Sequence, residues 1–408
     1  MRQLVSVHVG QCGNQIGQRF WSDLLCEYAT QELHSTMPIY TAEMASMFHN
    51  YDPRTAELLP PSSRVSHLVS RAVLVDMEER VINRAVHSRM GKIFNATVTD
   101  SCGSGNNWAV GNRVMGSKHG EDILELIRRE LESCDSCNGL LWSFSTGGGT
   151  GSGLGTFLLE QVVTEYPKLI QVVTAVYPSG PDDVVTWPYN TLLATRGLAE
   201  LATAILSMDN TALGRSKSVN AKISDLLVTL TAPVRTDEKH SLYDILKPAL
   251  VGGRKFLLPS VAHMKPGLIP ARAFDNMFSD IGRTQQLLLS VDAKRSVSIA
   301  TSAVVRIEPR VANDSDVKRN VTRLQATIRS ATPIHTSVVP SVDTSDNGSI
   351  AVLANSSAMS QLFDRTILSF DKLFKRRANL HHYTSLVDVE EFLEARECLL
   401  TLARNYVT

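Results

Sequence analysis

The segment SFSTGGGTGSG, residues 143–153, places five glycines between Gly147 and Gly153. Glycine lets the backbone take positive φ angles and approach a ligand closely, and free amides at a helix start carry partial positive charge. Together these features make an anion site, most often for phosphate. The spacing matches neither G-x-x-x-x-G-K-[ST] nor G-x-G-x-x-G. The segment therefore predicts a phosphate site of another kind, with a flexible glycine loop as the alternative.

Two other segments could complete a site for a polyphosphate. GQCGNQIG, residues 10–17, follows an apolar stretch and opens a helical pattern, so it offers a second set of free amides. SCGSGNNWAVGN, residues 101–112, adds glycines and the side chains of Asn106 and Asn107, which could equally form a plain turn. A polyphosphate held in this way would need no lysine.

Carboxylates follow two further strand-like stretches. The segment DMEE provides Asp76 or Glu78 to hold a hydrated Mg²⁺, although such a cluster is also typical of a helix N-terminus. The segment YPSGPDDVV provides Asp182 or Asp183 for the hydroxyl groups of a ribose. These residues extend the predicted phosphate site to a nucleotide site.

The loops lie between alternating strand and helix patterns. Apolar stretches predict strands at 4–10, 71–77, 140–144 and 170–178. Helical patterns lie at 12–24, at 121–131 and after Gly153, where Thr150 or Ser152 could cap the helix. This alternation predicts a parallel sheet wrapped by helices, in which ligands bind beyond the carboxyl ends of the strands. The five loops should therefore meet at one edge of the sheet.

From about residue 210 the pattern changes. Apolar residues at helical spacing, from Ile223 to Leu230, precede two alternating strands at 296–307 and 349–357. Two further helical patterns, at 363–374 and 389–403, end the chain. We expect an α/β parallel-sheet domain over residues 1–209. A smaller α+β domain with a core helix should follow over 210–356, and a C-terminal helical segment over 357–408.

Composition narrows the class of protein. The 408 residues include 41 basic and 41 acidic side chains, so no overall field favours nucleic acid or an anionic membrane. No stretch approaches the roughly eighteen apolar residues of a membrane span, and the N-terminus leads into a strand pattern rather than a signal peptide. The six cysteines, including the lone CxxC pair Cys134 and Cys137, are more typical of free thiols than of disulfide, zinc or redox sites. We expect a cytoplasmic protein without nucleic-acid or membrane partners.

Five segments together resemble the tubulin family. They are GQCGNQIG, GSGNNWAVG, STGGGTGSG, PYNTLL and RRANLHHYT, and the similarity runs over nearly the whole chain. The glycine motif is highly specific to tubulins and their bacterial relatives. Within the family, YPSGPDDVVTWPYN, NMFSD and ANLHHY are most similar to epsilon-type tubulins, with delta- and zeta-type tubulins as near alternatives.

The resemblance implies that GTP or GDP, with Mg²⁺, occupies the site. At the positions that match the family, the implied nucleotide-binding residues are Gly10, Gln11, Cys12, Gln15, Asn106, Ser145, Gly147, Gly148, Gly149, Thr150, Gly151, Asp183, Asn210 and Asn220. The implied metal residues are Glu78 and Asp76. Two positions depart from the pattern, because Trp187 replaces a ribose-binding glutamate and Ser216 replaces an aromatic residue that stacks on the base.

The resemblance also implies how hydrolysis and assembly occur. In tubulins one subunit carries a carboxylate to the nucleotide of the next, and Asp244 in SLYDILKP matches that catalytic glutamate. A positioned carboxylate can orient the attacking water, although Asp244 could instead be an exposed helix charge. The implied partners are other tubulins, through longitudinal contacts, and the implied location is the cytoskeleton of a centrosome, centriole or basal body. A structural or capping protein that keeps nucleotide without turnover is the alternative.

One loop and the end of the chain differ from the family. Between 260–267 and 274–280 lies only LIPARA, where other tubulins have a long loop that reaches the adjacent protofilament. We therefore expect weakened or redirected lateral contact.

The chain ends at Tyr406-Val407-Thr408, so we do not expect motors to dock through an acidic tail. A dinucleotide-dependent oxidoreductase, which also uses glycine turns in parallel sheets, is excluded by the glycine spacing.

Overall fold

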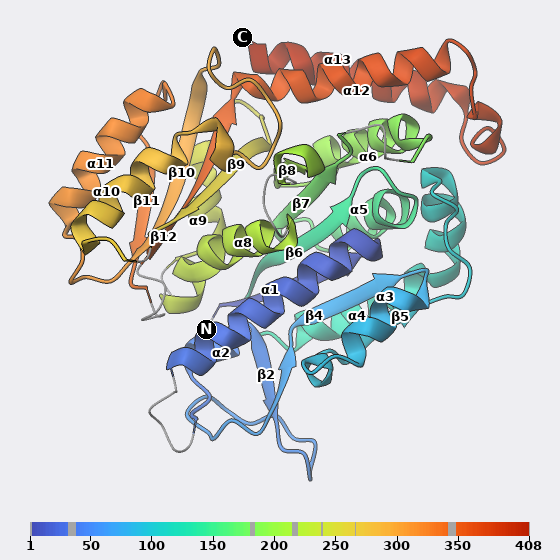
Figure 1. Ribbon diagram of the computed structural model, residues 1–408. Coiled ribbons are helices and arrows are strands. Elements are labelled where there is room, and N and C mark those ends of the chain that lie inside the picture. The colour runs from blue at the N-terminus through green and yellow to red at the C-terminus, as the bar shows by residue number, and fades with distance from the viewer. Residues whose placement is uncertain are drawn as a thin grey trace.

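In the computed structural model the described residues are 2–31, 38–179, 184–213, 219–237, 240–265, 267–341 and 348–407. Ten strands of this part of the chain form one sheet (Figure 1). In sheet order they are β11 (His335–Val339), β10 (Ser298–Ile307), β12 (Gly348–Ser356), β9 (Phe256–His263), β8 (Ala204–Asp209), β7 (Gln171–Tyr177), β6 (Cys137–Ser145), β1 (Gln3–Val9), β4 (Ala72–Asp76) and β5 (Ala96–Thr99). The strands from β9 to β5 are parallel, whereas β12 is antiparallel to both of its neighbours. This mostly parallel sheet confirms the predicted α/β fold.

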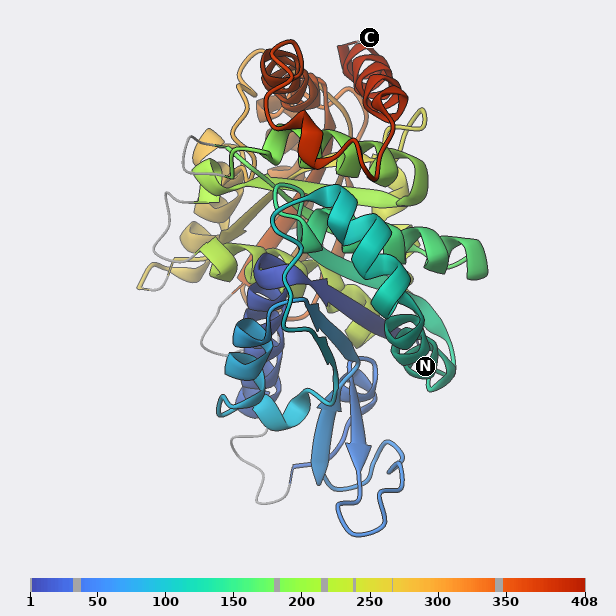
Figure 2. The ribbon, with the colours of Figure 1, turned by 90° about the vertical axis from the view of Figure 1, so that its right-hand side faces the viewer.

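The strands predicted from the sequence are present in the sheet. They correspond to β1, β4, β6, β7, β10 and β12. All residues of β4 and of β7 are buried, as expected for parallel strands that are covered on both faces. A separate hairpin of β2 (Phe48–Tyr51) and β3 (His67–Ser70) projects from the end of the molecule opposite the C-terminal helices (Figure 2).

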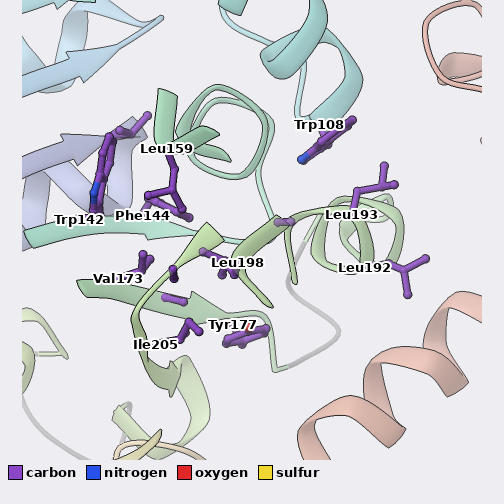
Figure 3. Packing of buried hydrophobic residues seen from close by; sticks show 14 of the residues in the cluster. Trp108, Trp142, Phe144, Leu159, Val173, Tyr177, Leu192, Leu193, Leu198 and Ile205 are labelled. Atoms are coloured by element: carbon purple, nitrogen blue, oxygen red, sulfur yellow. The ribbon is translucent and has the colours of Figure 1, made fainter. Parts of the chain in front are cut away.

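Helices cover both faces of the sheet. One face carries α1 (Gly10–Gln31), α3 (Glu79–Val86) and α8 (Val219–Thr236), and the other carries α4 (Gly116–Glu132), α5 (Gly155–Glu165) and α6 (Trp187–Leu201). Alternate residues of β1 belong to the two cores, because Leu4 packs with α1 whereas Val5 packs with α4 and α5. Figure 3 shows the second core, where Trp142 and Phe144 of β6 lie near Leu159 of α5.

The second half of the chain extends the same sheet. Helices α10 (Pro270–Ile281) and α11 (Asp314–Thr327) pack on β9, β10 and β12 in a third core. Helices α12 (Ser360–Phe374) and α13 (Val389–Val407) lie side by side and contact α6 (Figures 1 and 2). These two helices confirm the helical patterns at 363–374 and 389–403. Three shorter helices are α2 (Ala42–Ala45), α7 (Asn210–Leu213) and α9 (Leu242–Leu246).

The sheet is continuous between the two halves of the chain. Ile205 of β8 pairs with Phe256 of β9, and Leu206 pairs with Leu257. Hydrogen-bonded strands therefore lie on both sides of residue 209, where the sequence suggests a domain boundary, and the division into three domains stays a prediction. Among the described residues, no helix has the length and apolar character needed to cross a membrane.

Candidate functional site

A cleft of about 420 Å³ lies at the carboxyl ends of the parallel strands. It is lined by Val9, Gly10, Gln11, Cys12, Gln15, Asp76, Glu78, Ser104, Gly105, Asn106, Ser145, Gly148, Gly149, Thr150, Gly151, Val176, Asn210, Val219, Asn220 and Ile223. The structure thus brings together the predicted nucleotide and metal residues, except for Gly147 and Asp183, and the predicted catalytic residue Asp244 does not line the cleft. Asp183, like Ser216, lies outside the described residues.

The glycines of the turn serve two different purposes. A Cβ atom on Gly149 would collide with Ser104 Oγ and with the backbone of Asn107. A Cβ atom on Gly148 would meet only Asn106 Oδ1, at 3.9 Å. Gly149 therefore lets two loops pack closely, whereas Gly148 keeps its backbone open to the cleft.

Two helix starts meet in the cleft. Gly10, the first residue of α1, has a φ of +74°, and a Cβ atom there would lie 3.0 Å from the backbone nitrogen of Gly151. The other start is η3 (Thr150–Leu154), a π-helical turn that precedes α5. The prediction that Thr150 or Ser152 caps this helix is wrong, because helical geometry already begins at Thr150 and its N-cap makes no side-chain hydrogen bond. The glycines permit this early start and leave its amides to face an anion.

Asp76 and Glu78 provide carboxylates beside the glycine turn. Asp76 is only 3% exposed, burial raises its pKa to about 6, and its Oδ2 has no hydrogen-bond partner in the described part of the chain. Within those same residues no group of three or more His, Cys, Asp or Glu side chains could hold a metal alone. Mg²⁺ typically uses one or two carboxylates together with phosphate oxygens. The unpaired carboxylate and its neighbour therefore fit Mg²⁺ that is shared with a polyphosphate.

Part of the cleft lining is less polar. Asn210 begins α7 and Asn220 lies in the first turn of α8, as the sequence predicts for a residue at a helix start. Burial raises the pKa of Cys12 to about 12, so its thiol is neutral. Sequence reasoning missed four apolar residues of the lining, Val9, Val176, Val219 and Ile223. Amides beside apolar side chains suit a planar base with polar edges.

A buried asparagine, Asn190 of α6, fixes two of the loops. Its amide nitrogen donates hydrogen bonds of 2.8 Å to the carbonyl oxygens of Asn106 and of Gly147. Its side-chain oxygen accepts from the backbone nitrogen of Trp108 at 2.8 Å. Gly147 thus acts behind the cleft, through this bond, rather than in its lining. Asn190 lies in the PYNTLL segment, but no spacing rule identified it as a residue of the site.

Asp244 lies at the opposite edge of the sheet. The backbone nitrogen of its neighbour Leu242 donates a 3.1 Å hydrogen bond to Asn138 Oδ1, near the first residue of β6, whereas Ser145 at the end of β6 lines the cleft. Seven residues of strand separate these points by roughly 23 Å. Asp244 therefore cannot reach the cleft of its own chain.

The Asp244 carboxylate also has a local structural partner. Its Oδ2 accepts hydrogen bonds from the backbone nitrogen of Ser241 at 3.0 Å and from Ser241 Oγ at 2.7 Å. The first of these bonds and a 3.1 Å bond from the backbone nitrogen of Asp244 to Ser241 Oγ form a capping box at the start of α9. The bond from the Ser241 hydroxyl lowers the pKa of Asp244, so the carboxylate is ionised at neutral pH.

Comparison with known proteins agrees with this geometry. The GTPase domain of the Tubulin/FtsZ family matches residues 3–217. The tubulin epsilon chain of Mus musculus is 34% identical over 460 residues, and that of Homo sapiens is 33% identical over 464 residues, in each case covering 100% of this chain and 96% of the relative. The tubulin beta-3 chain of Echinococcus multilocularis is 30% identical over 438 residues, covering 100% of this chain and 95% of the relative. The domain match and the full-length similarity place the chain in the tubulin family of GTP-binding cytoskeletal proteins.

Proposed function

We propose that the cleft holds GTP or GDP with Mg²⁺, and that the chain acts as an epsilon-type tubulin in assembling the microtubules of centrioles or basal bodies. The observation that carries the binding proposal is one cleft that joins two helix starts, the open backbone at Gly148 and the unpaired carboxylate of Asp76. Helix-start amides bind phosphate oxygens, and Mg²⁺ neutralises charge on a polyphosphate. The location is supported by similarity to the tubulin epsilon chains alone.

Each group of cleft residues has its own part in this proposal. The β1–α1 and glycine loops bind the phosphates, Asp76 and Glu78 hold Mg²⁺, and Asn106 contacts the terminal phosphate. Asp183 binds the ribose, while the side-chain amides of Asn210 and Asn220 form hydrogen bonds with the polar edge of guanine. Neutral Cys12 lies within the same lining and adds an apolar surface.

Identification of the bound nucleotide tests the binding proposal. Purified protein is denatured gently, and the released small molecules are separated and compared with GTP, GDP and adenine dinucleotides. We expect about one guanine nucleotide per chain. Release of an adenine dinucleotide, or of no nucleotide from protein that also fails to bind added GTP, would overturn the proposal.

Assembly would occur end to end. The cleft lies at the carboxyl edge of the sheet, and Asp244 lies at the amino edge, where the nearby Leu242 contacts Asn138. In a head-to-tail stack the Asp244 edge of one subunit would meet the cleft of the next. This arrangement supports longitudinal contacts with other tubulins and hydrolysis that is completed only between subunits.

Lateral assembly is less favoured. The expected LIPARA loop is only partly a loop, because α10 already begins at Pro270, and residues 264–269 connect it with the end of β9 at His263. Six residues span at most about 20 Å when extended, and a loop that goes out and returns reaches much less. Electron microscopy of the protein with excess GTP tests this point. Closed tubes with regular lateral contacts, formed without another tubulin, would contradict it.

A nucleotide-holding cap without turnover is the second candidate. The capping box that engages the Asp244 carboxylate favours this candidate, because it gives the residue a purely structural use. Phosphate release from a confirmed longitudinal complex separates the two candidates. Steady release supports the enzyme, whereas permanently bound GTP supports the cap.

A further inference from the structure

The bend between α4 and β6 contains the CxxC pair, Cys134 and Cys137. The sequence alone favours ordinary thiols at these positions, but the structure adds three observations. The first is that the two intervening residues are fixed by β1. Gln3 donates from Nε2 to Asp135 Oδ2 at 3.2 Å, and the backbone nitrogen of Ser136 donates to Gln3 Oε1 at 3.0 Å. The bend is therefore held in one conformation, in which Cys134 Sγ donates to the carbonyl oxygen of Glu130 at 3.2 Å and Cys137 Sγ donates to that of Gly139 at 3.7 Å.

The second observation is a buried cation beside the pair. Arg71 is 4% exposed, and its Nη1 lies 3.5 Å from Cys134 Sγ and 3.1 Å from Ser133 Oγ. The same nitrogen lies 3.3 Å from His49 Nε2, which also contacts a carboxylate oxygen of Glu130 at 3.0 Å. A neighbouring guanidinium stabilises a thiolate over a thiol.

The third observation is access from the surface. Cys137 lines an open groove together with Tyr166, Lys168 and Glu132. The neighbouring Cys134 thiol lowers the pKa of Cys137, whereas the neighbouring Cys137 thiol and burial raise the pKa of Cys134. Cys137 is thus the member of the pair that lines the groove and is more readily ionised.

We propose that Cys134 and Cys137 form a redox-active dithiol, which a small-molecule disulfide such as oxidised glutathione converts to an intramolecular disulfide. The Cys137 thiolate attacks one glutathione sulfur and releases the other glutathione as a thiolate, which takes up a proton. Cys134 then loses its proton beside the Arg71 guanidinium, attacks the Cys137 sulfur and releases the second glutathione as a thiolate, which takes up that proton. Overall the pair loses two electrons and two protons, and one oxidised glutathione becomes two reduced molecules.

A zinc site at the same pair is less consistent with the structure. Structural zinc requires four ligands, and the described part of the chain contains no group of three or more candidate metal ligands. Cys134 and Cys137 would supply only two of them. A dithiol needs no further ligand.

Alkylation of the full-length protein tests the proposal. The protein is incubated with oxidised glutathione, treated with iodoacetamide and digested. The mass of the peptide that contains both cysteines is then measured by mass spectrometry. We expect this peptide to lose the mass of two hydrogen atoms and to resist alkylation until a reductant is added. Cys102 is exposed and has no cysteine three residues away, so it reports the general reactivity of a surface thiol.

Three variants sharpen the result. Cys134→Ser should trap glutathione on Cys137 as a stable mixed disulfide, and Cys137→Ser should make glutathione addition at position 134 several-fold slower. Cys102→Ser, the matched control, should form the internal disulfide at the wild-type rate. The proposal is overturned if the wild-type peptide keeps both thiols under conditions that modify Cys102, or if glutathione remains on wild-type Cys137.

Discussion

The hydroxyl of Tyr383 donates a 2.6 Å hydrogen bond to the side-chain oxygen of Asn190, although 193 residues separate them in the sequence. Tyr383 lies in the connection between α12 and α13, and it is fully buried. Asn190 in turn holds the carbonyl oxygens of Asn106 and Gly147 beside the cleft. One buried side chain therefore links the C-terminal helices to two loops of the proposed nucleotide site.

Removing only this hydroxyl should loosen the nucleotide. Tyr383→Phe keeps the ring in the core but leaves Asn190 without one partner. A hydrogen bond of this kind contributes about 1 kcal/mol, so we expect guanine nucleotide to dissociate about fivefold faster. Stopped-flow measurement with a fluorescent guanine nucleotide gives the dissociation rate.

Tyr406 provides a matched control on the same pair of helices. Its buried hydroxyl exchanges 2.9 Å hydrogen bonds with the backbone of Phe256, remote from Asn190. Tyr406→Phe should lower stability by a similar amount and leave the dissociation rate unchanged. Equal dissociation rates in the two variants would mean that Tyr383 only stabilises the fold.

Gly148→Ala should weaken nucleotide binding while sparing the fold. The added methyl group faces the cleft, where its nearest neighbour is Asn106 Oδ1 at 3.9 Å, and it would keep a phosphate away from the backbone. Loss of one such contact corresponds to roughly tenfold weaker binding. Isothermal titration with GDP gives the affinity, and thermal unfolding of the nucleotide-free protein gives the stability.

Two further glycines make that experiment interpretable. Gly149→Val should lose both binding and stability, because its side chain would collide with the loop at Ser104 and Asn107. Gly197→Ala, in α6, has only ordinary contacts at 3.5 Å and should change neither binding nor stability for the worse. Unchanged GDP affinity in Gly148→Ala would remove this glycine from the phosphate site.

The sequence predicts local features of the site better than its tertiary support. The glycine turn and the DMEE segment carry chemistry within a few adjacent residues, so their spacing alone indicates an anion site and a carboxylate pair. The bond between Tyr383 and Asn190 joins distant segments, and no period or motif encodes it. The capping box at Ser241 and Asp244 is different, because its S-x-x-D spacing was readable in the sequence. The family resemblance implies a catalytic role for Asp244 and does not indicate its role in capping α9.

A buried ion pair should make stability depend on acid pH. Glu27 of α1 lies 2.9 Å from Arg235 Nη1 and 3.0 Å from Arg306 Nη2. Burial alone would raise the pKa of Glu27, but the two guanidinium groups together hold it below its ordinary value of 4.5. Because the folded-state pKa is the lower one, this stabilisation is complete above pH 4.5 and is lost as pH falls through the folded-state pKa.

Glu27→Gln tests this dependence directly. At pH 7 the variant removes the charge of the carboxylate that lies between two buried guanidinium groups, and we expect a loss of about 3 kcal/mol in the free energy of unfolding by urea. The difference from wild type should shrink at acid pH, where the wild-type carboxyl is itself protonated. Glu125→Gln, which breaks ion pairs of Arg128 and Arg129 on the surface, should have little effect. A difference that stays constant with pH would show that the ionisation of Glu27 is irrelevant to stability.

Asp244→Asn separates the two uses of Asp244. The amide oxygen can still accept the hydrogen bonds from Ser241, so α9 keeps its cap, but the carboxylate that would orient a water molecule is gone. We expect unfolding and GTP binding close to wild type, together with phosphate release at least about a hundredfold slower in longitudinal complexes. Asp244→Ala should show the same loss of turnover and, in addition, up to about 1 kcal/mol of lost stability, because it removes the side-chain half of the capping box while Ser241 still caps α9. The complex must be confirmed by sedimentation for each variant, since the residue can act only on the cleft of a neighbour. If Asp244→Asn hydrolyses GTP at the wild-type rate while Asp244→Ala is merely less stable, the residue is a helix cap and the catalytic proposal fails.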